Sequence, residues 1–231
     1  MSKSIPNIEP GSSPAAILAA GIQAAGGNVS LACSFSLEDV AIIDLAHTAG
    51  VTLGVFALDT GRLHEETYEV AEALVERYRL KIDWYFPRHD AVETLERTKG
   101  LFSFRESLEN RHECCHIRKV EPLSRALKGL NGWVTGMRRE QSVTRSDLKA
   151  IERDELNGGI LKISPLLDWS EEQLLSYSEE QRLPKNRLYG QGYRSIGCAP
   201  CTRAVQPGED ARAGRWWWEN PEQKECGLHR R

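Results

Sequence analysis

Four of the six cysteines in this chain are grouped in a way that suits metal chemistry. Cys114 and Cys115 are adjacent. Cys198 and Cys201 form a C-x-x-C pair, which completes the four thiolates that a closed metal centre needs. A single zinc ion would have to take two neighbouring cysteines into one tetrahedron, which strains the short backbone between them, whereas an iron–sulfur cluster offers several irons. The pattern therefore favours a cluster over zinc, with four unrelated thiols as the remaining alternative.

A further cysteine, Cys226, lies five residues from the end of the chain in the segment KECGLH. Lys224 and His229 flank it, and neighbouring positive charge favours the reactive thiolate form of a cysteine. Gly227 leaves room for another molecule to approach the sulfur. Cys226 is therefore a candidate nucleophile, although an inert thiol near a chain end explains the same residues.

The segment SFSLED, residues 34–39, is a candidate anion-binding loop. It joins a predicted strand to a predicted helix, where hydroxyl and backbone N–H groups can hold an anion at the positive helix end. Capping of the helix by Ser36, with Glu38 and Asp39 complementing the helix dipole, is the alternative. The segment lacks a glycine-rich fingerprint, which argues against a dinucleotide site or a P-loop.

The segment LDTGRLHEET, residues 58–67, follows the next predicted strand and has the same two interpretations. Thr60 and Gly61 predict a turn. Asp59 is either a helix cap or part of a second wall of a nucleotide pocket, because both segments leave the same edge of the predicted sheet. His64 is interpreted as a residue at the start of a helix rather than as a metal ligand.

Basic residues gather in the segments that follow both cysteine pairs. Arginine forks suit bidentate recognition of phosphate or sulfate oxygens, and ordinary surface charge is the alternative. The basic residues are Lys119, Arg138, Arg139, Arg145, Arg203, Arg212 and Arg215.

Three adjacent tryptophans, residues 216–218, cannot all face one core from a single element, so at least one is expected to anchor the tail or meet a partner.

The elements that must position these residues alternate between strands and helices. Such alternation predicts parallel βαβ units, in which ligands bind at the carboxyl ends of the strands. A helix over residues 117–127 and a strand over 132–135 follow. An acidic helix capped by Ser170 precedes an irregular segment that begins at Pro184. The first predicted strands are residues 28–34, 51–60 and 81–86, and the helices between them are residues 14–27, 36–50 and 62–80.

Composition places the chain among ordinary globular proteins. Its 231 residues are 40% hydrophobic and 27% charged, and the formal net charge of −3 argues against nucleic acid as a partner. No run approaches the roughly 18 apolar residues of a membrane span, and the polar N-terminus shows no signal core, so we expect a cytoplasmic protein with reduced thiols. The expected parts are a disordered leader (1–13), an α/β nucleotide- and cluster-binding domain (14–202) and a tail carrying the catalytic cysteine (203–231).

Several motifs, taken together and in this order, resemble one enzyme family. They are CCHIRKVEPLSRAL, WVTGMRREQSVTR, GYRSIGCAPCTRAVQPGEDARAGRWWWE and KECGLH. The chain is similar over residues 34–229 to the iron–sulfur type of assimilatory adenylyl-sulfate (APS) reductases, within the PAPS reductase family. The resemblance implies a Rossmann-like fold of the adenine nucleotide alpha hydrolase type, with a mostly parallel sheet flanked by helices and an irregular, mobile C-terminal tail.

The resemblance also implies roles for individual residues. Cys226 would be the nucleophile. The segment SFSLED stands where the wider class often has a Ser-Gly-Gly loop, a departure that leaves the individual contacts of this loop open. The implied ligands of a [4Fe-4S] cluster are Cys114, Cys115, Cys198 and Cys201. The implied substrate contacts are Ser34, Ser36, Glu38, Asp39, Leu58, Thr60, Lys119, Gly136, Arg145, Arg212, Arg215 and His229.

The implied reaction is the thiol-dependent reduction of adenosine 5′-phosphosulfate (APS) to sulfite and AMP in sulfate assimilation and cysteine biosynthesis. It would pass through an S-sulfocysteine on Cys226, which thioredoxin or glutaredoxin releases. Related enzymes that use the 3′-phosphorylated substrate (PAPS) generally lack the paired cluster cysteines, so APS is favoured here. The resemblance is compatible with a homo-oligomer.

Two other functions fit parts of the pattern. A regulatory module that binds a nucleotide beside a zinc ion or a cluster would bind APS or AMP without releasing sulfite, but it has no need of Cys226. A nucleotidyl transferase related to the ATP pyrophosphatases would consume ATP, and the missing glycine loop argues against it.

Overall fold

The computed structural model describes residues 5–9, 11–141 and 148–220, which form two compact units. No linker stands out in the sequence because the chain passes between the units several times. The predicted boundaries after residues 13 and 202 stay predictions. The first unit comprises Met1–Ala57, Val70–Asp83 and Leu127–Lys185, and the second comprises Leu58–Glu69, Trp84–Ala126 and Asn186–Arg231.

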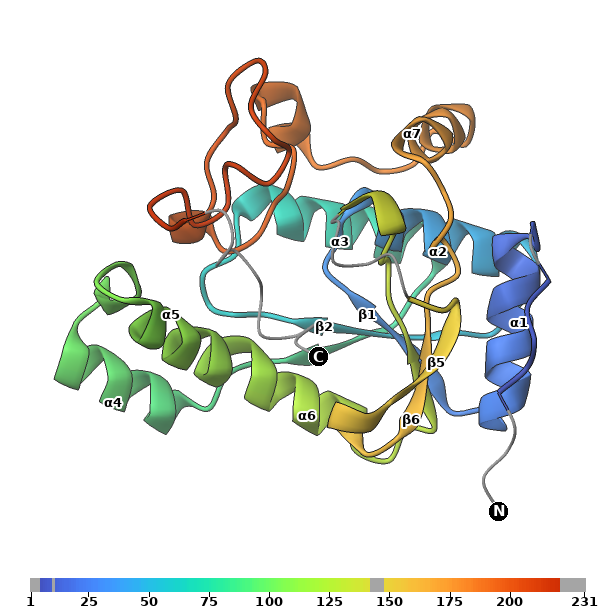
Figure 1. The fold of residues 1–231 in the computed structure, drawn as a ribbon, viewed down its shortest axis with the longest axis horizontal. Coiled ribbons are helices and arrows are strands. Elements are labelled where there is room, and N and C mark those ends of the chain that lie inside the picture. The colour runs from blue at the N-terminus through green and yellow to red at the C-terminus, as the bar shows by residue number, and fades with distance from the viewer. Residues whose placement is uncertain (1–4, 10, 142–147, 221–231) are drawn as a thin grey trace. The chain divides into compact units, whose positions relative to one another are not determined.

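The first unit is built on a six-stranded sheet with the strand order β3-β2-β1-β4-β6-β5 (Figure 1). β1 pairs in parallel with β2 and β4, β4 pairs in parallel with β6, and β5 runs antiparallel to β6. This arrangement confirms the predicted Rossmann-like, mostly parallel α/β sheet. The strands are β1 (Val29–Cys33), β2 (Gly54–Leu58), β3 (Ile82–Tyr85), β4 (Gly132–Val134), β5 (Ile151–Asp154) and β6 (Ile160–Ile163).

The predicted helices of this sheet unit are present, and their observed ends lie within about three residues of the predicted ones. Ser13 caps α1 (Pro14–Ala25), and Gly26, in the left-handed conformation with φ 76°, ends it. α2 (Leu37–Thr48) follows its Ser36 cap and packs against β1 and against α7 (Glu171–Glu180) (Figure 1). Ser170 and Gln173 form a capping box at the start of α7. α3 (Glu65–Tyr78) connects β2 to β3.

The core of the first unit lies between the sheet and these helices. Leu31, Val134 and Ile163 are fully buried in the central strands, and Ala41 on α2 is equally buried. A Cβ atom on Gly21 would lie only 2.6 Å from Ile163 Cδ1, so the glycine allows α1 to pack closely on β6. The carboxyl ends of the central strands therefore have a rigid support.

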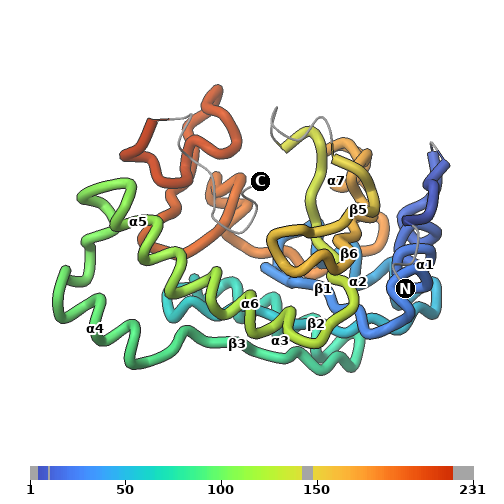
Figure 2. The backbone as a smooth tube through the Cα atoms, turned by 60° about the horizontal axis from the view of Figure 1, so that its bottom comes forward, coloured from blue at the N-terminus to red at the C-terminus, as the bar shows by residue number. Residues whose placement is uncertain are grey.

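The second unit carries helices that the sequence analysis placed only in part. α4 (His89–Lys99) was not predicted, because Leu95 is its only buried residue and its apolar pattern is correspondingly weak. The predicted helix over 117–127 is wrong at its start. It begins as α5 (Leu108–Cys115), capped by Ser107, and continues through the π-helical turn η2 (His116–Val120) into α6 (Glu121–Leu127) (Figure 2).

The rest of the second unit, from residue 186 to residue 220, is irregular as predicted. It contains the 3₁₀ turns η6 (Arg187–Gln191) and η7 (Ala199–Cys201) and an isolated antiparallel bridge between Thr202 and Arg215. Across the described parts of the chain, no helix has both the length and the apolar character that crossing a membrane requires.

Candidate functional site

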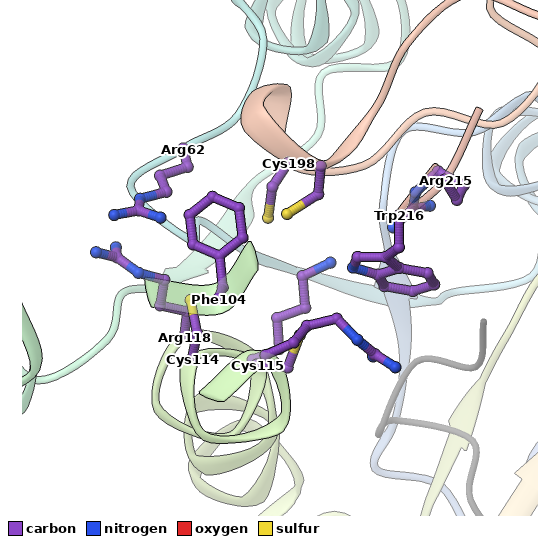
Figure 3. Close-up of a pocket in the computed structure, with 11 residues that line it drawn as sticks. Arg62, Phe104, Cys114, Cys115, Arg118, Cys198, Arg215 and Trp216 are labelled. Carbon is purple, nitrogen blue, oxygen red and sulfur yellow. The ribbon is translucent and has the colours of Figure 1, made fainter. Parts of the chain in front are cut away.

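The four grouped cysteines line one pocket in the second unit (Figure 3). Cys114 and Cys115 end α5, and the turn that carries Cys198 and Cys201 faces them. The pocket has about 370 Å³ of empty space, part of it open to solvent. The other lining residues are Arg62, Phe104, Arg111, Arg118, Lys119, Arg215 and Trp216.

Local backbone structure explains why these thiols meet. Cys201 N–H donates to the Cys198 carbonyl at 2.9 Å, which closes the C-x-x-C turn, and the Thr202 hydroxyl donates to the same carbonyl at 2.9 Å. Ala199 N–H donates to the Arg62 carbonyl at 2.7 Å and ties this turn to the segment after β2. A π-helical turn follows Cys115 directly, and such turns recur at functional sites.

The thiols of the pocket differ in how readily they ionise. Burial raises the pKa of Cys201 to about 12, and the neighbouring Cys198 and Cys115 sulfurs add to the effect. Burial also raises the pKa of Cys114, with Arg118 opposing it. Burial acts in the same direction on Cys198, but Lys119, the Thr60 hydroxyl and two arginines together lower its pKa. Positive charge beside Cys114 and Cys201, such as a bound metal supplies, would favour their thiolate forms.

The donor set fits a cluster better than a single ion. Zinc would need all four sulfurs at about 2.3 Å, whereas a cluster spreads its ligands over several irons. Arg118 Nε and Trp216 Nε1 are buried donors without an acceptor in the described chain, and a sulfur-rich group could accept from them.

Trp216 organises the basic side of the pocket. The guanidinium groups of Arg111 and Arg215 both contact its ring, and the Cζ atom of each lies 4.6 Å from the ring centroid. Trp216 is 1% exposed and has a φ of 41°, a conformation that a bulky residue rarely adopts. Arg111 Nε also donates to Glu219 at 2.7 Å. Trp217 is 38% exposed, so the adjacent tryptophan rings do not share one core.

The structure places Thr60 against the cysteine pocket. Its hydroxyl lies 3.3 Å from Cys198 Sγ and accepts from Arg62 N–H at 3.2 Å. Leu58, the last residue of β2, precedes it. Asp59 Oδ1 accepts from Gly61 N–H at 2.7 Å, so the predicted turn exists and Asp59 stabilises it. His64 lies directly before α3, as expected for a residue at a helix start.

The candidate anion loop lies in the first unit, at the carboxyl end of β1. Asp39 Oδ2 accepts from both the backbone N–H and the hydroxyl of Ser34, each at 2.7 Å. Ser36 caps α2, so the capping interpretation holds for this residue. Burial raises the pKa of Asp39 to about 6, against the hydrogen bonds from Ser34. Phe35 has a φ of 63°, a backbone conformation that usually favours glycine.

Glu38 and Gly136 complete the surroundings of this loop. Glu38 Oε1 accepts from Arg138 Nε at 3.1 Å and from Gln141 Nε2 at 2.9 Å. A Cβ atom on Gly136 would lie 2.6 Å from Asp39 Oδ1 and 2.7 Å from Glu38 Cβ, so only glycine fits. The loop thus meets the segment after β4 through a buried, charge-balanced contact.

The remaining predicted residues differ in where they lie. Arg212 lies in the turn before Arg215, where its carbonyl accepts from Arg215 N–H at 2.9 Å. Arg139 and Arg203 form ordinary ion pairs with Asp168 and Glu209. Arg145, Cys226 and His229 lie outside the described residues.

Sequence reasoning did not single out three arginines of the cysteine pocket. Arg62 and Arg118 stand within quoted segments, but no spacing distinguishes them from surface arginines. Arg111 lies one helical turn before Cys115 on α5 and is fully buried, which a charged sequence such as ENRHE does not suggest. The position of Arg111, four residues before Cys115, is the one available signal.

Comparison with known proteins assigns the family. The model of the phosphoadenosine phosphosulfate reductase domain matches residues 28–204. An adenosine 5′-phosphosulfate reductase of Burkholderia cepacia is 51% identical over 201 residues, covering 87% of this chain and 80% of that protein. One of Allochromatium vinosum is 50% identical over 204 residues, covering 88% and 79%. The chain therefore belongs to the phosphoadenosine phosphosulfate reductase domain family, as the motifs indicated.

Solved structures agree on the fold. The crystal structure of phosphoadenylyl-sulfate (PAPS) reductase from Candida auris, a phosphate complex, superposes with a TM-score of 0.71 at 28% identity. The alignment covers 84% of this chain and 91% of that one. Yeast FAD synthetase, at 18% identity and a TM-score of 0.54 over 77% of this chain and 58% of that one, shares the fold alone.

Proposed function

We propose that this protein reduces adenosine 5′-phosphosulfate to sulfite and AMP in sulfate assimilation. The observation that carries the proposal is the meeting of four cysteines from two distant segments in one pocket rich in arginine and lysine. Relatives about half identical over most of the chain are named adenosine 5′-phosphosulfate reductases, which supports this substrate over PAPS.

Four cysteines would hold a [4Fe-4S] cluster in this pocket. When bound, the cluster would tune the local electrostatics rather than pass electrons, because the thiols supply the reducing electrons. Lys119 would direct its ammonium group toward the substrate anion from the turn after Cys115, and Thr60 would support the Cys198 sulfur. The four ligands would be Cys114, Cys115, Cys198 and Cys201.

Cationic and hydroxyl groups would bind the substrate. Arg215 and Lys119 line the cysteine pocket and would offset the charge of the phosphosulfate. Ser34 and Ser36 would contribute from the amino-terminal end of α2, where the helix dipole favours anions. The further contacts proposed from the family motifs are Glu38, Asp39, Leu58, Gly136, Arg145, Arg212 and His229.

Cys226 would carry out the chemistry. Its thiolate attacks the terminal sulfur of the substrate, an S–S bond forms, the bridging S–O bond breaks, and AMP leaves with the electron pair. A thiolate of reduced thioredoxin or glutaredoxin then attacks the Cys226 sulfur, and sulfite leaves with the electrons of that bond. The second thiol of the carrier resolves the mixed disulfide and restores Cys226. A cytoplasmic location, where such carriers stay reduced, suits this cycle.

Mass spectrometry of the intact protein tests the nucleophile. Reduced protein incubated with APS alone is expected to gain one sulfonate, and Cys226→Ser is expected to gain none. Cys33→Ala is the matched control, because Cys33 is buried at the end of β1 and should leave the adduct intact. An adduct that survives Cys226→Ser contradicts the proposed role.

Metal analysis and product assays test the rest. Anaerobically purified protein is expected to contain iron and sulfide in equal amounts, and stoichiometric zinc without iron would contradict the cluster. With reduced thioredoxin present, sulfite release should be faster from APS than from PAPS. Tight nucleotide binding without any sulfite release would identify a binding module instead.

A further inference from the structure

Glu96, on the unpredicted helix α4, holds two arginines of the cysteine pocket. Its Oε1 accepts from Arg62 Nη2 at 2.5 Å and from Arg118 Nη2 at 2.7 Å. The Glu96 side chain is 17% exposed, and those of Arg62 and Arg118 are 16% and 7% exposed. A single, largely buried carboxylate oxygen therefore fixes two guanidinium groups at once.

Each of these arginines connects segments that line the pocket. Arg118 Nη1 donates to the Thr60 carbonyl at 2.7 Å, and Thr60 in turn contacts Cys198. Arg62 Nη2 donates to the Leu101 carbonyl at 2.8 Å, and its guanidinium lies 5.1 Å from the centre of the Phe104 ring. The arginines thereby join the turn after β2 to α4 and to the helix that follows the paired cysteines.

Arg62 also reaches the C-x-x-C turn through its backbone. Its carbonyl accepts from Ala199 N–H at 2.7 Å, so displacement of Arg62 would move the residue next to Cys198. Arg62 and Arg118 also line the same pocket as Cys114 and Cys115. One contact network thus supports cysteines of both pairs.

We propose that Glu96 is a positioning residue for the metal centre, acting through Arg62 and Arg118, which rests on the proposed cluster-binding function. Loss of its charge leaves two guanidinium groups beside the thiolates without their shared carboxylate. Outer residues that orient metal ligands commonly contribute 10- to 100-fold to metal affinity. Because Glu96 acts on the cysteines only through the arginines, we expect its effect on metal affinity to lie at the lower end of that range.

Two variants, Glu96→Gln and Glu96→Asp, separate the effect of the carboxylate charge from the effect of the side-chain length. Glu96→Gln keeps the shape and removes the charge, so iron release to a chelator should become about tenfold faster. The reduction potential of the centre should also become more positive, because the net local charge rises. Glu96→Asp keeps the charge but is one methylene shorter, so it should speed iron release without the same positive shift.

Glu93→Gln is the matched control. Glu93 lies on the same helix and pairs with Arg97 at 3.7 Å, but both side chains are more than half exposed. We expect wild-type iron release and potential for this variant. A merely structural role of Glu96 would lower thermal stability without shifting the reduction potential.

A double-mutant cycle tests whether Glu96 acts through Arg118. Lysine cannot reach both the Thr60 carbonyl and Glu96, so Arg118→Lys should itself speed iron release. Adding Glu96→Gln to Arg118→Lys should then speed iron release by clearly less than the roughly tenfold expected in the wild-type background, because only the contact with Arg62 remains to be lost, whereas independent effects would multiply.

The outcomes distinguish this inference from the proposed function. Wild-type protein that contains no iron would overturn both. Wild-type protein with iron, in which Glu96→Gln matches Glu93→Gln in iron release and reduction potential, would overturn the role of Glu96 alone. Multiplying effects in the double mutant would overturn action through Arg118.

Discussion

The loop at residues 34–39 and the four-cysteine pocket differ in how their charges are balanced. In the loop, each buried carboxylate has donors within the same unit: Asp39 accepts from Ser34, and Glu38 accepts from Arg138. Around the pocket, five lining residues are cationic, and the carboxylates seen to pair with them are Glu96 and Glu219.

This difference predicts which property of the protein a substitution in each region will alter. A site whose charges are satisfied by the protein itself is stable without a ligand. Several cationic side chains gathered beside buried thiols favour the binding of an anion or of a thiolate-bound metal. Changes at the loop should therefore reduce the free energy of unfolding, and changes at the pocket should mainly reduce ligand binding.

The largest effect that tests this contrast is expected from the pH dependence of Asp39. Its pKa is about 6 in the folded protein, above the ordinary value of 3.8, so the folded state binds the proton more tightly. Stability from this group is present below pH 4 and is lost as the pH rises through 6, by about 3 kcal/mol. In urea unfolding, Asp39→Asn should lack this loss.

The free energies of unfolding of wild type and of Asp39→Asn are measured from pH 4 to pH 8, and their difference is followed with pH. Asp168→Asn removes an exposed carboxylate and controls for the change in net charge. If the difference between wild type and Asp39→Asn stays constant with pH, Asp39 is not the buried titrating group that the loop geometry indicates.

A smaller loss of stability is expected from Gly136→Ala. The new Cβ would collide with Asp39 Oδ1 and Glu38 Cβ, which are held by the start of α2 and by buried hydrogen bonds. Overpacking of this kind costs about 1–3 kcal/mol, measurable as a lower urea midpoint. Gly190→Ala is the matched control, since nothing lies within 4 Å of its Cβ position, and it should unfold like wild type.

The smallest change in stability is expected from Gly197→Ala at the pocket. Its Cβ would lie 2.5 Å from Arg215 Cζ, the end of a flexible side chain that can move away. We expect a KM for APS raised about tenfold, equivalent to about 1.4 kcal/mol of binding energy, with little change in urea unfolding. A large loss of stability with an unchanged KM would show that the two regions do not differ in this way.

Particular residues show how far sequence reasoning reached. Ser36 and Ser170 were recognisable as helix caps because capping is a local interaction within four residues. Strands β5 and β6 were missed because each has four residues and gains its stability by pairing with the other. The predicted start of the helix at 117 was wrong because polar residues over 108–116 hide a helix whose buried side includes Arg111.

Glu96 could not have been found from the sequence for a related reason. Its helix shows one buried apolar residue, and its partners Arg62 and Arg118 stand 34 and 22 residues away. Ion pairs over such separations leave no periodic pattern. A glutamate on a largely polar helix is predicted to be solvent-exposed until the packing of three segments is known.

The sequence by itself determined the family, the α/β class and the identity of the cysteines that meet, because hydrophobic periodicity, capping residues and motif order are local properties of the chain. Tertiary structure alone decided which further charges stand beside those cysteines. Arg62, Arg111 and Arg118 acquire their role from burial and from contacts between distant segments. Electrostatic energy depends on distance and desolvation, and neither is written in the order of residues.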